Sequence, residues 1–438
     1  QRLDNFNGGD DRVWNQRYFA NDQFSASTGP VFLNIGGEGP ASHAWMTEGH
    51  WVTMAQQTKA MLFQIEHRFY GDSHPTHDAS IENLSFLSSE QALADIANFI
   101  TNITATYKLH GRKWIVFGGS YSGALSVWAR FKYPHLISGA ISASAPLQPL
   151  MNFYQYQEVV QTSLTTLGSP TCAKNVLTAS DAITTLLKSE SGCKILSSHF
   201  KLCSPLSESV NDQFWFQESV ANNIQEVVQY NRDNNEFEGG KGRFNITHIC
   251  KIMDDESLGG PLERYAELNT QTLKEMNITC LDSSFKKFIS DTKSTSWDKA
   301  TGMRQWTYQT CAEFGWFQTT DSKNQPFHGF PLKLSLEICE EVFGIGAEQL
   351  NRGIQRSLEN YGGVAIAGLV TNVTLYNGKI DPWSAVSYPT LTSVGIRSIV
   401  VPDTAHCAIM YPASPHDSQY LKQARLEVER ELKAWLGL

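Results

Sequence analysis

The sequence lacks any apolar run that approaches the roughly 18 residues of a membrane-spanning helix. It is also poor in basic residues, because 35 Lys and Arg stand against 44 Asp and Glu, for a net charge of -9. Binding to nucleic-acid phosphates needs clustered Lys and Arg, so this balance argues against a nucleic-acid partner. No repeat or low-complexity tract interrupts the 438 residues. The composition therefore predicts a globular chain with a large core and more than one folded unit.

Cysteine is absent from the first 171 residues, and none of the eight cysteines forms a C-x-x-C pair. The missing pair argues against a zinc site, and the even count predicts disulfides whose pairing is not derivable from the sequence. The cysteines are Cys172, Cys193, Cys203, Cys250, Cys280, Cys311, Cys339 and Cys407.

Five N-x-S/T sequons predict N-glycosylation and, with the cysteines, a secretory-pathway protein that is secreted or lysosomal. The alternative is a cytosolic protein with free thiols. The chain begins at Gln1 without a Met or a signal segment, as is expected of a mature, processed form. The sequons are at Asn83, Asn102, Asn245, Asn277 and Asn372.

Strands and helices alternate in the first part of the chain. Apolar runs predict strands over Val31–Ile35 and Met61–Ile65, and one apolar face predicts a helix over Ser89–Tyr107. Further along, a helix is expected over about 124–132 and a strand over 138–142. This alternation predicts an α/β fold with a mostly parallel sheet and helices on both faces.

The composition changes from about Met151 to Trp297, where Gln, Asn, Ser and Thr are frequent and strand candidates are few. We predict an inserted helical cap here, crosslinked by disulfides. Strands over Val370–Leu375 and Arg397–Val401, then a helix over Asp417–Trp435, resume the α/β pattern. The predicted division is an α/β core over 1–150, a cap over 151–297 and the second part of the core over 298–438.

One motif carries most of the chemistry. A strand-like run ends in Gly118-Gly119-Ser120, and a helix-forming stretch follows. This pattern is typical of a nucleophile elbow, in which glycines allow a sharp turn that holds a serine hydroxyl clear of a sheet. The strict G-x-S-x-G pattern has glycine where this chain has Ser122. Ser120 as a small turn residue, and Ser122 as the nucleophile, stay open as alternatives.

A nucleophilic serine needs a histidine base and a carboxylate that orients it. In α/β-hydrolases these follow the serine in the order acid, then histidine, on loops after strands. Asp381 and His406 occupy such loops, so we predict a triad of Ser120, Asp381 and His406. Asp381 as a turn cap, Asp403 as a rival acid and His416 as a rival histidine are the alternatives.

Two backbone N–H groups are expected to bind the oxyanion, those of Tyr121 and Gly37. Gly37 belongs to the turn 36–39 after an early strand, which could equally be a plain tight turn. Glu38 in the same turn is a candidate anchor for the amino terminus of a substrate, or else a solvated loop charge. The turn is not a phosphate loop, because no Gly-Lys-Ser/Thr follows it.

No metal or other cofactor is expected. The run 66–77 holds three histidines, but they lack a helical i, i+4 register and a carboxylate companion. We predict an ion-paired structural turn after the strand instead.

The ordered set of motifs resembles the lysosomal Pro-Xaa carboxypeptidase family of serine peptidases, which includes dipeptidyl peptidase II and the thymus-specific serine protease. The resemblance covers nearly the whole chain. It rests on the segments 66–71, 87–92, 118–121, 132–135, 377–383 and 405–406.

The resemblance implies an α/β-hydrolase with a helical cap, a catalytic Ser120-Asp381-His406 set, cleavage after proline near a peptide end in acidic compartments, and a homodimer. Two departures resemble the thymus-specific branch: Ser122 stands where carboxypeptidase relatives have glycine, and Gly37 stands where they have Asn.

The favoured hypothesis is therefore a serine exopeptidase that hydrolyses short peptides, after proline, through an acyl-enzyme. One alternative is a catalytically weak or inactive structural or assembly protein on the same scaffold. Another is an α/β-hydrolase that acts on esters or lipids.

Overall fold

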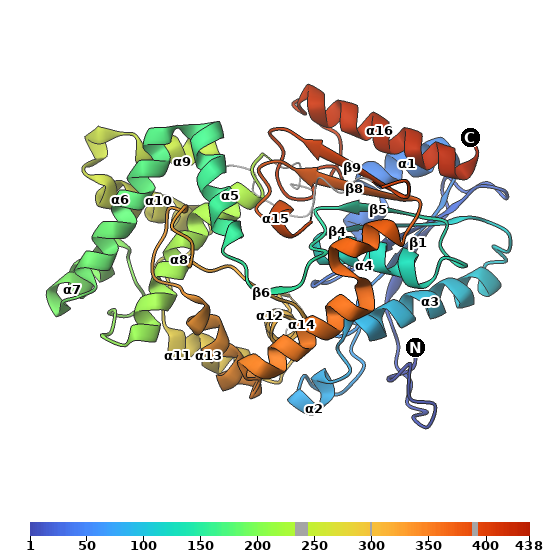
Figure 1. The fold of residues 1–438 in the computed structure, drawn as a ribbon, viewed down its shortest axis with the longest axis horizontal. Coiled ribbons are helices and arrows are strands. Elements are labelled where there is room, and N and C mark those ends of the chain that lie inside the picture. The colour runs from blue at the N-terminus through green and yellow to red at the C-terminus, as the bar shows by residue number, and fades with distance from the viewer. Residues whose placement is uncertain (233–243, 298–299, 388–392) are drawn as a thin grey trace.

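The computed structural model describes residues 1–232, 244–297, 300–387 and 393–438 (Figure 1). Seven strands form its main sheet, in the order β1-β3-β2-β4-β5-β8-β9. The edge strand β1 is antiparallel to β3, and the other neighbouring pairs are parallel. The strands are β1 (Tyr18–Asn21), β2 (Val31–Ile35), β3 (Met61–Ile65), β4 (Trp114–Gly119), β5 (Gly139–Ala143), β8 (Val373–Gly378) and β9 (Ile396–Val401).

Helices cover both faces of this sheet (Figure 1). Val31 packs in one hydrophobic cluster with α3 and α4, whereas its neighbour Phe32 packs in a second cluster with α1 and α16. Because successive side chains of a strand point to opposite faces, the sheet is buried on both sides. The predicted α/β-hydrolase class is confirmed. The helices are α1 (His50–Thr58), α2 (Ile81–Leu84), α3 (Ser89–Thr106), α4 (Ser120–Lys132), α15 (Ser384–Ser387) and α16 (Gln419–Leu436).

A long helical stretch separates β5 from β8, and it also holds the small parallel pair β6 (Leu150–Asn152) and β7 (Gly315–Phe317). Figure 1 shows α5 to α10 gathered at one end of the molecule, away from the main sheet. The helices are α5 (Gln155–Ser163), α6 (Pro170–Leu186), α7 (Glu190–His199), α8 (Val210–Gln229), α9 (Ile246–Met253), α10 (Pro261–Glu275), α11 (Phe285–Lys293), α12 (Met303–Gln309), α13 (Leu332–Phe343) and α14 (Ala347–Tyr361).

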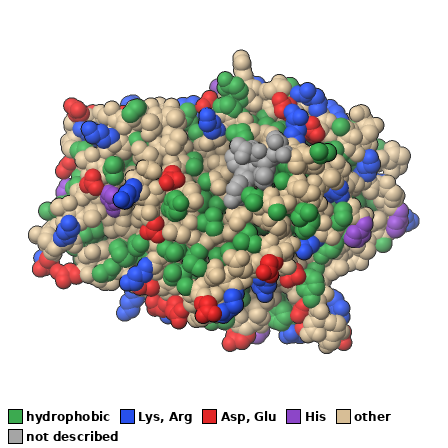
Figure 2. Space-filling view, in the orientation of Figure 1, with side chains coloured by type: hydrophobic (Ala, Val, Ile, Leu, Met, Phe, Trp, Pro, Cys, Tyr) green, Lys and Arg blue, Asp and Glu red, His purple; other side chains and the backbone are tan. Residues whose placement is uncertain are grey.

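The three-part division of the chain stays a prediction. Its boundary at 297/298 falls at residues 298–299, which lie outside the described residues. Helices α12 to α14 follow that boundary, so the main sheet resumes only at β8. None of the helices in the described ranges has the length and apolar character needed to cross a membrane. On the face drawn in Figure 2, basic and acidic side chains are interspersed rather than gathered in a basic block.

Three disulfides crosslink the helical stretch: Cys172–Cys250, Cys203–Cys280 and Cys311–Cys339. The prediction of disulfides from the even count is wrong for Cys193, and Cys407, whose pairing the sequence leaves open, forms no disulfide either. Both thiols are buried, but in different hydrophobic clusters, so they do not meet. Each Sγ lies instead near a backbone carbonyl, that of Leu187 at 3.9 Å for Cys193 and that of Ala143 at 3.8 Å for Cys407.

The segment after β3 forms an ion-paired turn, as predicted. Glu66 is fully buried and pairs with Arg17. Arg68 donates two hydrogen bonds to Asp95, at 2.6 and 2.8 Å, and both side chains are buried. The charges of this segment are thus compensated inside the fold.

A buried polar network joins this turn to the start of α4. The Tyr121 hydroxyl lies 3.1 Å from His67 Nε2 and accepts a hydrogen bond from Gln309 Nε2 at 3.0 Å. Gln309 also donates to Glu313, which accepts from the backbone N–H of Ser89. Burial lowers the pKa of His67 to about 4, so its imidazole is neutral at physiological pH. This network therefore links helices α3, α4 and α12 through hydrogen bonds.

Candidate active site

Ser120 lies at the turn between β4 and α4, with a φ of 57° that non-glycine residues rarely adopt. Two glycines before it allow close packing. A Cβ atom at Gly118 would lie 2.1 Å from the carbonyl oxygen of Ser122, and one at Gly119 would lie 2.5 Å from Met410 Sδ. This strained strand-to-helix turn is the backbone geometry of a nucleophile elbow.

Ser122 takes part in the turn itself. Its Oγ donates a hydrogen bond to the carbonyl of Gly119 at 2.8 Å and accepts one from the N–H of Gly119 at 3.1 Å. The side chain is 7% exposed. Because its hydroxyl proton is held by a backbone carbonyl, Ser122 is poorly placed to act as the nucleophile in place of Ser120.

The Gly118→Ala variant is expected to lose about 2–3 kcal/mol of its free energy of unfolding, because the added methyl overlaps the backbone of α4. Gly8→Ala is the matched control, since a Cβ atom there would meet nothing within 4 Å. Chemical denaturation followed by tryptophan fluorescence measures both. Equal stabilities of the two variants would contradict this description of the elbow.

Asp381 and His406 come together from the loops after β8 and β9. The Nδ1 atom of His406 lies 3.0 and 2.9 Å from the two carboxylate oxygens of Asp381. Asp381 is fully buried and His406 is 2% exposed. Burial acts to lower the pKa of His406, but the Asp381 carboxylate and the neighbouring Cys407 side chain together outweigh it, and the pKa is raised well above its usual value. The pair has the geometry of a base and the acid that orients it.

Ser120 and His406 both line one cavity of about 340 Å³. The Nε2 atom of His406 is buried and has no hydrogen-bond partner in the described part of the chain. No hydrogen bond joins the Ser120 and His406 side chains, but such contacts are often loose in free enzymes and tighten with substrate. The rivals Asp403 and His416 line a separate cavity that neither Ser120 nor His406 borders.

The predicted oxyanion donors lie on two sides of Ser120, Gly37 in this cavity and Tyr121 next to Ser120 in the chain. Gly37 lines the cavity of Ser120, and a Cβ atom built on it would lie 3.5 Å from Ser122 Cβ. Tyr121 is the second residue of α4, so its N–H has no acceptor within the helix. Both N–H groups therefore come from the walls around Ser120, where a developing oxyanion would need them.

The family model described as Serine carboxypeptidase S28 matches residues 1–428. The chain belongs to the serine carboxypeptidase S28 family. Among its relatives, the Caenorhabditis elegans protein named "Putative serine protease K12H4.7" is 36% identical over 100% of this chain and 87% of its own length. The thymus-specific serine protease of Mus musculus is 32% identical over 100% of this chain and 86% of its own. The lysosomal Pro-X carboxypeptidase of Homo sapiens is 28% identical over 100% of this chain and 87% of its own length.

The resemblance drawn from the sequence motifs is thus confirmed, and the chain is an S28 serine peptidase. Its three disulfides are typical of a secretory-pathway protein. The homodimer stays a prediction.

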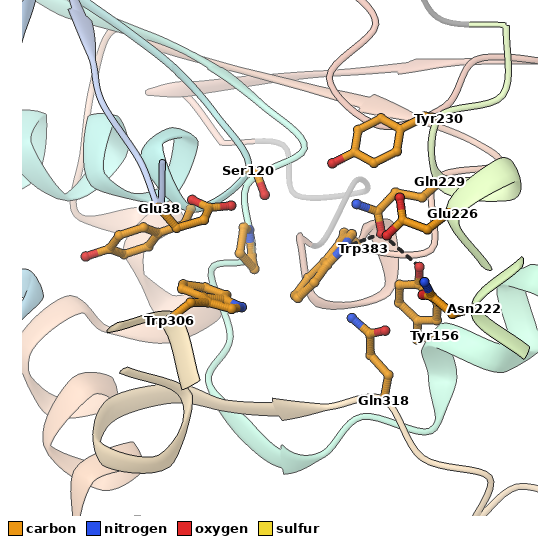
Figure 3. Close-up of a pocket in the computed structure, with 12 residues that line it drawn as sticks. Glu38, Ser120, Tyr156, Asn222, Glu226, Gln229, Tyr230, Trp306, Gln318 and Trp383 are labelled. Atoms are coloured by element: carbon orange, nitrogen blue, oxygen red, sulfur yellow. Dashed lines mark hydrogen bonds between the residues drawn. The ribbon is translucent and has the colours of Figure 1, made fainter. Parts of the chain in front are cut away.

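A second cavity of this S28 peptidase, of about 190 Å³, opens beside Ser120 (Figure 3). Sequence reasoning singled out Glu38 for this region but missed the residues that the helical stretch contributes. These carry no local motif, because a residue of an amphipathic helix reaches a distant site only through the tertiary fold. Besides Glu38, Ser120 and Tyr121, the lining comprises Pro146, Tyr156, Asn222, Glu226, Gln229, Tyr230, Trp306, Gln318 and Trp383.

Gln229, at the end of α8, connects the helical stretch to the loops that carry Asp381 and His406. Its Oε1 accepts hydrogen bonds from Tyr156 Oη at 2.8 Å and from Trp383 Nε1 at 3.0 Å (Figure 3). Its backbone carbonyl accepts from the N–H of His406 at 2.8 Å. Trp383 is further tied to Asp381, whose carboxylate accepts from the Trp383 N–H at 2.9 Å. One residue of the helical stretch thus helps to position the loops of Asp381 and His406.

Gln229→Met is expected to lower kcat by about 10- to 100-fold, because small shifts of the catalytic loops are costly. It keeps the backbone carbonyl but removes the acceptor of Tyr156 and Trp383. Gln229→Glu keeps an acceptor oxygen and should recover most of the loss. Steady-state kinetics on a short peptide measures both, and a methionine variant as active as the parent would contradict the positioning role.

The histidines of the run 66–77 have other contacts. His67 Nδ1 lies 2.7 Å from the carbonyl oxygen of Arg68, and the His74 ring stacks on Trp297 with centroids 3.9 Å apart. Among the described residues, no three His, Cys, Asp or Glu side chains gather as a metal site would require.

Proposed function

We propose that this S28 peptidase is a serine exopeptidase that hydrolyses short peptides through an acyl-enzyme on Ser120. The observation that carries the proposal is the Asp381–His406 pair: the His406 Nε2 has no partner among the described residues, and His406 borders the cavity that Ser120 lines. In this proposal His406 is the general base and then the general acid, and Asp381 orients the imidazole and stabilises its protonated form.

The reaction follows from these positions. Ser120 Oγ attacks the scissile carbonyl while its proton passes to His406 Nε2. The N–H groups of Gly37 and Tyr121 stabilise the oxyanion. His406 then gives the proton to the leaving amine, which departs and leaves an ester on Ser120. A water molecule, deprotonated by His406, hydrolyses this ester and restores the enzyme.

The enclosure of the site favours short substrates. Side chains of α5 and α8 and residues 306 and 318 wall the cavity beside Ser120, which measures about 190 Å³. A folded protein could not enter such a space. Trp306 and Trp383 offer flat apolar surfaces that suit a proline ring, and a relative is named a Pro-X carboxypeptidase. These features support cleavage after proline.

We also propose a secreted or lysosomal glycoprotein. Asn102 and Asn277 are exposed, and the side chains of Asn83, Asn245 and Asn372 are part-buried and make hydrogen bonds within the fold. Asn102 and Asn277 are therefore the most accessible of the five sequons for an attached glycan.

Profiling a peptide library, with proline placed at successive positions, between pH 4 and 8 tests the proposal. We expect cleavage of peptides of a few residues, fastest after proline, and no cleavage of a folded protein. Turnover of acyl esters without any peptide cleavage would favour the ester hydrolase, and no turnover of either would favour the inactive scaffold.

A further inference from the structure

We propose that the acidic cavity lined by Glu38 and Glu226 binds the free α-ammonium group of the substrate, so that this enzyme removes residues from the amino end of peptides. The inference rests on the proposed function and assigns it a substrate class. It adds a residue of the helical stretch, Glu226, to the anchor role that the sequence predicts for Glu38 alone.

The two carboxylates come from different parts of the chain and border one cavity. Glu38 lies in the turn after β2, and Glu226 lies in the last turn of α8. In Figure 3 they stand on opposite sides of the space into which Ser120 points. A peptide whose carbonyl lies at Ser120 would therefore have acidic groups on both sides of its acyl part.

Neither carboxylate is already used by the protein. Within the described residues neither Glu38 nor Glu226 forms a salt bridge, and the hydrogen bond that the Glu38 carboxyl group accepts comes from its own backbone N–H. Burial raises the pKa of both carboxyl groups, and the charge of His406 acts in the opposite direction. Buried carboxylates without a counter-charge gain most from an incoming cation, since charge-assisted hydrogen bonds are strongest where water is scarce.

The same cavity is unsuited to the carboxylate at the other end of a peptide. Among the described residues that line the two cavities around Ser120, none is Lys or Arg. His406 is the one basic side chain among these described lining residues, and in the proposed function it transfers protons. A terminal carboxylate would thus meet two like charges and no fixed cation among these described residues, whereas an ammonium would meet two opposite charges.

The catalytic histidine marks where the scissile carbonyl must lie. His406 is 2% exposed, and its Nε2 has no partner in the described part of the chain, yet it borders the cavity that Glu38 and Ser120 also line. The substrate carbonyl must therefore lie between Ser120 and His406. Since an extended chain advances about 3.5 Å per residue, an α-ammonium one or two residues upstream falls within the walls of so small a cavity.

Three versions of one short peptide test the proposal: with both ends free, with an acetylated amino end, and with an amidated carboxyl end. We expect acetylation to lower kcat/KM by about 100-fold and amidation to change it little. Glu38→Gln and Glu226→Gln should each lower kcat/KM for the free peptide by about 10- to 100-fold, with little effect on the acetylated one. Glu218→Gln, on α8 but outside the cavity lining, is the matched control and should behave as the parent.

The rate at which an uncharged phosphonate modifies Ser120 separates loss of anchoring from loss of catalysis, and it should be unchanged in both Gln variants. Equal cleavage of the free and acetylated peptides, or cleavage abolished by amidation, would overturn the amino-end anchor while leaving the peptidase assignment intact. Absence of cleavage of all three peptides, with no phosphonate labelling, would instead overturn the proposed function.

Discussion

Replacing Ser120 by Ala is expected to lower turnover of peptides by roughly 10⁶-fold, as removal of the nucleophile of a serine triad does elsewhere. No other hydroxyl takes its place, because the nearby Ser122 hydroxyl is bonded to the backbone of Gly119. Rates are measured with purified parent and variant at equal concentration, and circular dichroism checks that the variant is folded.

Ser122→Ala is the control for this result. It removes two hydrogen bonds inside the elbow but leaves Ser120, Asp381 and His406 in place, so we expect turnover within about 10-fold of the parent. The reverse outcome, an active Ser120→Ala and an inactive Ser122→Ala, would make Ser122 the nucleophile and the assignment wrong.

Asp381→Asn is expected to lower kcat by about 10⁴-fold, because the imidazole then loses the partner that fixes its tautomer and stabilises its charge. The pH profile should shift as well. Protonated His406 cannot accept the proton of Ser120, so kcat/KM falls as the pH drops below the pKa of His406. Asp381 raises that pKa, and without its charge the fall should move to lower pH.

Asp403→Asn provides the comparison, since Asp403 lies in the histidine loop but borders a different cavity. We expect its rate and pH profile to match those of the parent. A loss at Asp403 as large as that at Asp381 would show that the acid has been misassigned.

The strands of the buried sheet could be predicted from the sequence because their hydrophobic pattern is unambiguous. The runs 31–35 and 61–65 coincide with β2 and β3, which are buried at every residue. The edge strand β1 was not predicted, since its four residues alternate between exposed and part-buried and carry a weak signal. Pairing with β3, a tertiary contact, is what makes this segment a strand.

The residues of the candidate site likewise fall into those that the sequence predicts and those that it does not. Ser120, Asp381 and His406 lie on turns and loops with local signatures, so their chain order sufficed to predict them. Glu226 and Gln229 lie on α8, and only the tertiary fold brings them to the cavity beside Ser120. The cysteine count likewise predicted disulfides but could not exclude Cys193 and Cys407, which are kept apart by the fold.

The most direct test of the account is to treat the parent protein with a serine-reactive phosphonate and to map the modified residue by peptide mass spectrometry. We predict one phosphonyl group per chain, on Ser120, and none on the His406→Ala variant, which lacks the base. Stoichiometric modification of another residue, or no modification of a folded parent at any pH from 4 to 8, would contradict the assignment of Ser120 as the nucleophile.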